Sequence, residues 1–130
     1  MFVRFVTAEV HKDSQSQLGV FQAAFRLRDK DELYDYEEVL LPEVLDWFNK
    51  HLEKPDKFTS SKPPYYRKKS KAISWFKGSA KDHLAMMRQI VSILENHDVP
   101  TRMIKTARPG YIVYEDEYQV AAEPFADRKL

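Results

Sequence analysis

The feature that most constrains the fold is the helical spacing of apolar residues between Ser79 and Asn96. The apolar positions recur every three or four residues: they are Leu84, Met87, Ile90, Val91, Ile93 and Leu94. This spacing predicts an amphipathic helix, whose apolar face has to be buried against another element. Ser79 is a good N-cap for this helix, and Pro100 prevents a long extension. We expect this helix to be the main one that packs on a sheet.

Candidate strands lie on both sides of this helix in the chain. The stretch 2–10 is rich in Phe, Val and Thr and is apolar on both alternating faces, which is typical of a strand inside a sheet. Further short strands are predicted at 72–76, 101–107, 111–114 and 118–122. The sequence Arg108-Pro-Gly-Tyr111 is typical of a type II turn, with Pro and Gly at its centre. We therefore expect the last three strands to form an antiparallel meander.

Two more helical segments lie in the first half of the chain. In 14–28, Ser14 and Gln17 resemble a capping box, and apolar residues recur at helical spacing. The spacing in 33–52 is also helical, but Pro42 lies in its middle. Proline disrupts a helix interior and suits the first helical position, so we expect two helices or one kinked helix. A new helix that starts at Pro42 is the favoured alternative.

Together these elements predict the α+β class. We expect one domain over residues 1–130, since this length suffices to bury a core. The predicted architecture is a mostly antiparallel sheet of about five strands, with three to four helices packed on one face. The order of the strands in the sheet is not predicted, apart from the three-stranded meander at the carboxyl end.

Composition removes several classes of function. The chain has no cysteine, which excludes disulfides, thiol catalysis and zinc bound by cysteine, and fits a reducing cytosol. Charged residues from Arg4 onward argue against a signal peptide, and no apolar run reaches the length of a membrane span. With only three glycines there is no Gly-rich phosphate loop. We expect a cytoplasmic protein that uses no membrane and no cofactor.

The segment 54–71 differs from the rest of the chain in charge. From Lys57 to Lys77 there are seven Lys and Arg residues and no acidic residue, whereas residues 1–56 have a net charge of −5 and residues 111–130 one of −3. Pro63 and Pro64 favour an extended backbone within it. A nearly neutral chain thus carries a strongly basic centre, which favours electrostatic attraction of an anionic partner.

This basic–aromatic segment contains the residues for which we predict a binding role. Lysine and arginine side chains attract phosphates, and aromatic rings stack on bases. The predicted contact residues are Lys62, Tyr65, Tyr66, Arg67, Lys68, Lys69 and Lys71, to which Lys105 and Arg108 are added if the fold brings them near. We expect a small non-catalytic binding protein, with nucleic acid as the favoured partner. The competing interpretation is a solvated loop whose lysines only maintain solubility.

Two alternatives stay open. The basic centre of one copy can meet an acidic flank of another, which predicts a self-associating structural or regulatory homodimer. A small enzyme whose pocket cannot be read from the sequence is the further alternative, and its catalytic residues are unknown. The acidic run Glu115–Glu117 has the ligand type of a divalent metal site, but an exposed hairpin turn is the favoured interpretation. The four histidines show no zinc-binding spacing, so we predict no metal site.

Overall fold

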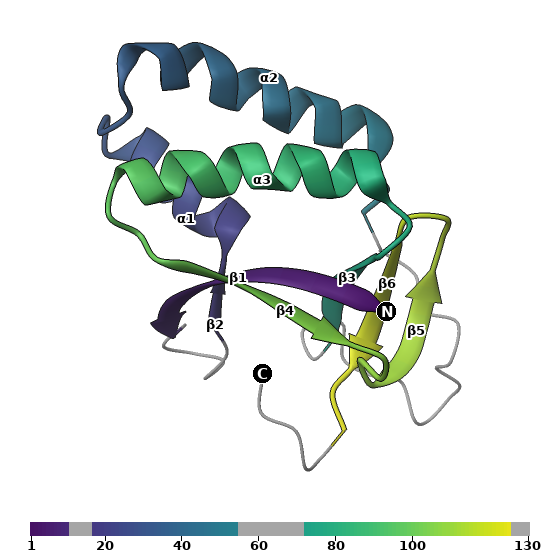
Figure 1. Cartoon of the computed structure of the whole chain (residues 1–130). Coiled ribbons are helices and arrows are strands. Elements are labelled where there is room, and N and C mark those ends of the chain that lie inside the picture. Colours follow the sequence, from purple (N-terminus) through teal and green to yellow (C-terminus); the bar gives the residue numbers. More distant parts are fainter. Residues whose placement is uncertain (11–16, 55–71, 126–130) are drawn as a thin grey trace, which may run out of the picture.

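The computed structural model of the protein describes residues 1–10, 17–54 and 72–125. These residues form one six-stranded sheet whose strand pairs are all antiparallel, with three helices over one face (Figure 1). The elements in chain order are β1 (Phe2–Val10), β2 (Gln17–Gly19), α1 (Val20–Asp29), α2 (Asp35–His51), β3 (Ile73–Lys77), α3 (Lys81–Asn96), β4 (Thr101–Thr106), β5 (Tyr111–Glu115) and β6 (Gln119–Glu123). The predicted α+β class is confirmed.

Strand β1 is the centre of the sheet, as its apolar character on both faces predicts. One of its edges pairs with β4 over six residues, from Phe2 with Thr106 to Thr7 with Thr101. Its other edge is shared by two strands. β3 pairs with Phe2 and Val3, whereas β2 pairs with Val6 and Val10. This edge of β1 is therefore split, and Arg4 and Phe5 lie opposite the gap between β3 and β2.

The predicted three-stranded meander at the carboxyl end is wrong. β5 and β6 do form a hairpin, but β6 continues the sheet through β3, and β4 pairs with β1 instead. Only residues 107–110 join β4 to β5, a link of five Cα steps that reaches at most about 17 Å. Four strand spacings in a flat sheet measure about 19 Å, so the sheet has to curl to bring its edges together.

Gly110 allows this turn into β5. Its φ of +138° lies in a region that only glycine adopts readily. A Cβ atom at this position would also run into the backbone carbonyl of Glu123 at the end of β6. The predicted type II turn is therefore wrong: the chain only bends at the Pro-Gly pair, and the bend crosses from one edge of the curled sheet to the other.

The predicted helix over 14–28 is shorter than expected. α1 begins at Val20, and Gln17 to Gly19 form β2, while Ser14 lies outside the described residues. The capping contact is displaced to Gly19, whose backbone N–H donates to Gln22 Oε1 at 2.9 Å. Glycine is accepted at an N-cap and disfavoured inside a helix, so Gly19 ends the strand and starts the helix.

Helix α2 runs through Pro42 without a break, so the favoured new start there is wrong. Residues on both sides of the proline, Leu41 and Val44, are at most 1 % exposed, and this burial offsets the missing hydrogen bond. Helix α3 matches its prediction closely, although its N-cap is Ala80 and not Ser79. Ile90 and Leu94 of α3 are fully buried.

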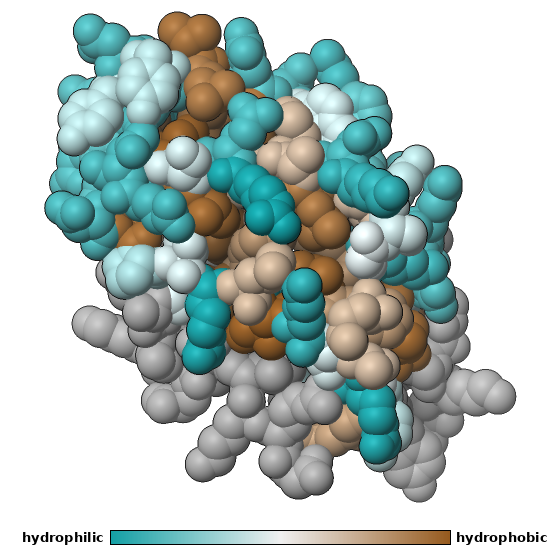
Figure 2. All heavy atoms as spheres, in the orientation of Figure 1, coloured by the Kyte–Doolittle hydropathy of each residue, from teal (hydrophilic) through white to brown (hydrophobic). Residues whose placement is uncertain are grey.

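The main core lies between the helices and one face of the sheet. Val3, Phe5 and Phe76 supply the sheet side of this core, and apolar residues of all three helices supply the other. α2 and α3 run side by side above the sheet (Figure 1). At the top of Figure 2, over α2, apolar atoms emerge among hydrophilic ones. None of the described helices has the length and apolar content that a membrane crossing requires.

Candidate functional site

The structure describes two of the nine predicted contact residues, Lys105 and Arg108. Lys62, Tyr65, Tyr66, Arg67, Lys68, Lys69 and Lys71 lie outside the described residues. Lys105 is exposed on β4, and Arg108 is exposed in the link from β4 to β5, where its guanidinium lies 5.0 Å from the ring centre of Phe125. Since β1 separates β4 from β3, Lys105 lies on the other side of β1 from Ala72, which precedes β3.

A large cleft of about 960 Å³ opens at the split edge of β1. Arg4 and Phe5 lie at the split, with β3 and its preceding residue Ala72 on one side. Gly19 and α1 line the other side, and the carboxyl end of α2 with residues 52–54 completes the wall. The lining thus comes from elements far apart in the sequence. Its size is at the upper end of the range typical of small-molecule sites.

Arg4 is the unusual residue of this cleft. Its side chain is largely buried, which lowers the pKa of its guanidinium below the ordinary value. The Nη1 atom is buried and has no hydrogen-bond partner, and none of the described acidic residues forms an ion pair with Arg4. Arginine nevertheless stays protonated in proteins. Arg4 is therefore a largely buried positive charge without a counterion among the described residues.

Trp75 provides a second buried donor without a partner. The pairing of β1 with β3 ends at Val3 and Phe76, and Trp75, the next residue of β3, pairs with Val120 of β6. Trp75 is 1 % exposed, lines the cleft, and its indole Nε1 is buried without a partner. Buried N–H groups are normally hydrogen-bonded, because an unpaired one costs about 1–3 kcal/mol. The described residues thus contain two buried donors, on Arg4 and Trp75, that lack an acceptor.

Other polar groups around the cleft already have partners. Gln119 donates through Nε2 to the backbone carbonyl of Glu53 at 2.5 Å and to Asp116 Oδ2 at 3.1 Å. Asp116 also accepts from the backbone N–H of Tyr118 and from the hydroxyl of Tyr114, both at 2.8 Å. These contacts tie the β5–β6 turn to residue 53, at the rim of the cleft.

Asp116 and Glu117 of the acidic run lie in this turn, directly after Glu115 ends β5, in line with the favoured interpretation of a hairpin turn. Burial raises the pKa of Asp116, but hydrogen bonds from Tyr118, Gln119 and Tyr114 outweigh it, so the pKa lies below its ordinary value. The carboxylate thus serves as an acceptor within the turn. Among the described residues there is no group of three or more His, Asp or Glu side chains that could hold a metal ion.

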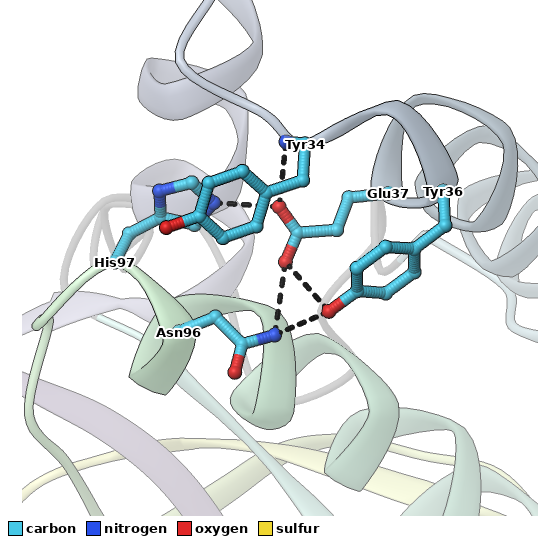
Figure 3. Close-up of polar contacts among 5 residues, drawn as sticks. All are labelled: Tyr34, Tyr36, Glu37, Asn96 and His97. Carbon is cyan, nitrogen blue, oxygen red and sulfur yellow. Dashed lines mark hydrogen bonds and ion pairs between the residues drawn. The ribbon is translucent and has the colours of Figure 1, made fainter.

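A second buried polar cluster joins the start of α2 to the end of α3 (Figure 3). Glu37 is 0 % exposed, and its Oε1 accepts from His97 Nε2 at 2.6 Å and from the backbone N–H of Tyr34 at 2.9 Å. Its Oε2 accepts from Asn96 Nδ2 at 3.1 Å and from the Tyr36 hydroxyl at 3.4 Å. The ring of Tyr34 stacks on His97 with centroids 4.6 Å apart.

In this cluster the hydrogen bonds to Glu37 offset the cost of burying its carboxylate. Burial alone raises the pKa of Glu37, but the hydrogen bonds from His97, Tyr34 and Asn96 outweigh it and hold the pKa below its ordinary value. The carboxylate is therefore ionised and accepts from four donors. None of these residues lines the cleft. The arrangement is that of a structural clamp between two helix ends.

Among the described histidines, His51 and His83 meet, which the sequence does not reveal. His83 is buried and donates from Nε2 to the backbone carbonyl of His51 at 2.7 Å. Its ring stacks on Tyr118 at 4.3 Å, and the edge of Trp47 lies against it at 4.8 Å. This aromatic cluster connects α2, α3 and the β5–β6 turn, so it supports the wall behind the cleft.

Sequence reasoning missed Arg4 and Trp75 as site residues. The signal for Arg4 was present, since it is a charged residue in a strand that is apolar on both faces. Trp75 was part of the predicted strand at 72–76, but nothing in the sequence indicated that its N–H would lack a partner. Comparison of the chain with protein-family models, with curated proteins and with solved structures finds no match.

Proposed function

We propose that this protein is a non-catalytic binding protein for an anionic partner, and that the partner's charge is held at Arg4. The observation that carries the proposal is the buried guanidinium with an unpaired Nη1. A buried charge without a counterion costs several kcal/mol in real proteins, roughly 3–5 kcal/mol when a partner has been removed. A bound anion at Arg4 would remove this cost.

Nucleic acid is the partner that the basic–aromatic segment favours. Lys54 and Ala72, which flank residues 55–71, both line the cleft. A nucleic-acid strand bound by Lys68, Lys69 and the adjacent tyrosines would therefore lie close to the cleft, because the residues on both sides of this segment line it. Phosphates on the lysines and bases on the rings are the contacts of single-stranded nucleic-acid binding.

The lining of the cleft favours binding over catalysis. Of the described residues that form it, none is a histidine, and Glu53 is the single carboxylate. General acid–base catalysis needs a titratable group within reach of the substrate, and it usually needs two with separated pKa values. The Glu37–His97 pair has suitable chemistry but lies outside the cleft.

The test is fluorescence anisotropy of labelled single- and double-stranded DNA and RNA with the full chain, at two salt concentrations. We expect binding of single strands that weakens steeply with salt, since bound phosphates release counterions. The double variant Lys68→Glu, Lys69→Glu should weaken binding, whereas Lys50→Glu on the exposed face of α2 should change it little. An absence of binding at low salt would remove nucleic acid as a partner. Sedimentation would then test self-association through the basic centre.

A further inference from the structure

The first half of α2 exposes apolar side chains to solvent. Val39 is 63 % exposed, the largest exposed fraction of any described large apolar residue except Met1, and Tyr36 is 57 % exposed. These two positions are three residues apart, so they are neighbours on the helix surface. Val39 lies on the opposite side of α2 from the buried Leu41 and Val44. Apolar atoms accordingly reach the surface over α2 at the top of Figure 2.

The ring of Tyr36 is fixed in its exposed position (Figure 3). Its hydroxyl accepts from Asn96 Nδ2 at 2.6 Å and donates to Glu37 Oε2 at 3.4 Å. These contacts hold the hydroxyl at the end of α3, while more than half of the residue stays exposed. A ring that is already held in place loses little conformational freedom when a partner packs on it, and this pre-organisation favours binding.

Unpaired carboxylates lie beside these apolar residues. Residues 31–43 contain six acidic residues and no basic one. Asp35 precedes Val39 by four positions and Glu43 follows it by four, so both are its neighbours on the helix surface. Both are exposed, and neither forms an ion pair with a described residue. We call Asp35, Tyr36, Val39 and Glu43 together the α2 face.

The acidic groups elsewhere on α2 and in the β5–β6 turn have partners within the chain. Asp116 accepts hydrogen bonds inside the turn, and Glu115 pairs with Lys77 at 2.6 Å. In the second half of α2, Asp46 pairs with Lys50 at 2.9 Å. The α2 face instead combines free carboxylates with an exposed ring. Lysine and arginine side chains bind carboxylates by charge and aromatic rings by cation–π attraction, so this face fits a partner rich in both.

We infer that the α2 face binds the basic–aromatic segment of a second copy of this chain. The segment, residues 54–71, contains seven Lys and Arg residues and one acidic residue, so its charge is complementary to that of residues 31–43. Packing of one α2 face on another would bring like charges together and is disfavoured. Because each copy has one face and one segment, two copies can exchange both contacts in a two-fold dimer. This inference goes beyond the proposed function, since the partner is the chain itself.

Sedimentation velocity of the full chain at two salt concentrations tests the inference. We expect a reversible dimer at about 50 mM salt that weakens at least about tenfold at about 500 mM, because salt screens exposed ion pairs. Val39→Ser removes the apolar contact and Glu43→Lys brings like charges together, so each should weaken the dimer severalfold. Asp82→Lys makes the same change of charge at an exposed position in the first turn of α3 and should leave the dimer unchanged. A chain that stays monomeric at low salt and millimolar concentration would overturn the inference.

A mixing experiment identifies the segment as the occupant. The double variant Lys68→Glu, Lys69→Glu keeps the α2 face, whereas Glu43→Lys keeps the segment. Each variant alone should dimerise more weakly than the wild type. An equimolar mixture should form a heterodimer, because one native contact is restored and opposite charges also meet in the other. Dimerisation of the segment variant with wild-type affinity, or absence of a heterodimer in the mixture, would contradict the assignment.

The dimer and the nucleic-acid partner are tested separately. Val39→Ser leaves the segment unchanged and should bind labelled oligonucleotides at least as tightly as the wild type does. If the wild type is monomeric and binds oligonucleotides, the dimer is wrong and the proposed function holds. If the wild type dimerises as described and binds no oligonucleotide, nucleic acid is wrong as the partner and the segment acts in self-association.

Discussion

Two buried polar regions of this protein contrast in how far their hydrogen bonds are satisfied. At Glu37 a carboxylate accepts from four donors, and the charges and hydrogen bonds are balanced within the protein. At Arg4 a buried cation and the neighbouring Trp75 N–H have no acceptor among the described residues. A satisfied cluster stabilises the fold, whereas unpaired buried donors lower its stability. The difference separates a structural clamp from a candidate binding site.

The largest expected effect is at the clamp. Glu37→Leu should lower the free energy of unfolding by about 3 kcal/mol, because His97, Asn96 and the Tyr34 N–H lose their common acceptor. Urea denaturation measures this loss. Glu38→Leu, on the exposed side of the same turn, is the control and should change stability by less than about 0.5 kcal/mol. If Glu37→Leu lowers the free energy of unfolding no more than Glu38→Leu does, the cluster at Glu37 does not stabilise the fold, and its contrast with Arg4 is lost.

The clamp also predicts a dependence of stability on pH. The pKa of Glu37 is lower in the folded protein than in the unfolded chain. Its contribution is therefore fully present above about pH 4.5, the ordinary value, and is lost as pH falls through the folded pKa. Denaturation between pH 7 and pH 3 should show a smaller loss for Glu37→Gln than for the wild type. Some loss should persist in this variant, since the pKa of Asp116 is also lowered. If the free energy of unfolding falls equally with pH in the wild type and in Glu37→Gln, the ionisation of Glu37 does not contribute to this pH dependence.

The smallest expected effect has the opposite sign. Arg4→Met should leave stability unchanged or raise it by about 1 kcal/mol, because an apolar chain of similar length replaces an uncompensated charge. The same urea titration measures this change, with Arg88→Met as the matched surface control. A gain in stability combined with lost ligand affinity would mark Arg4 as a residue kept for binding. Destabilisation by 2 kcal/mol or more would instead indicate that Arg4 has a structural partner.

Local patterns in the sequence predicted most of the elements but not their boundaries at two points. The stripe from Leu84 to Leu94 identified α3, and the apolar run 2–10 identified an interior strand. The helix expected to begin at Ser14 begins instead at Val20, since Gly19 takes the N-cap. Pro42 did not break α2, because burial on both sides of it outweighs a lost hydrogen bond.

The candidate site was less predictable than the fold. The sequence directed attention to charge density, and so to Lys62 to Lys71 in the basic–aromatic segment. Arg4 was visible as a charge within an apolar strand, but its lack of a counterion depends on which strands lie beside it. Trp75 became a candidate only through the burial of its unpaired N–H, which depends on the elements around it.

The sequence by itself determined the α+β class, the helical and extended periods and the segregation of charge, because these follow from spacing and composition along the chain. Only the tertiary structure decided that β4 pairs with β1, that β2 and β3 share one split edge, and that Arg4 is largely buried without a counterion among the described residues. Strand order and register depend on contacts between distant residues, and local propensity carries no information about which of those contacts form.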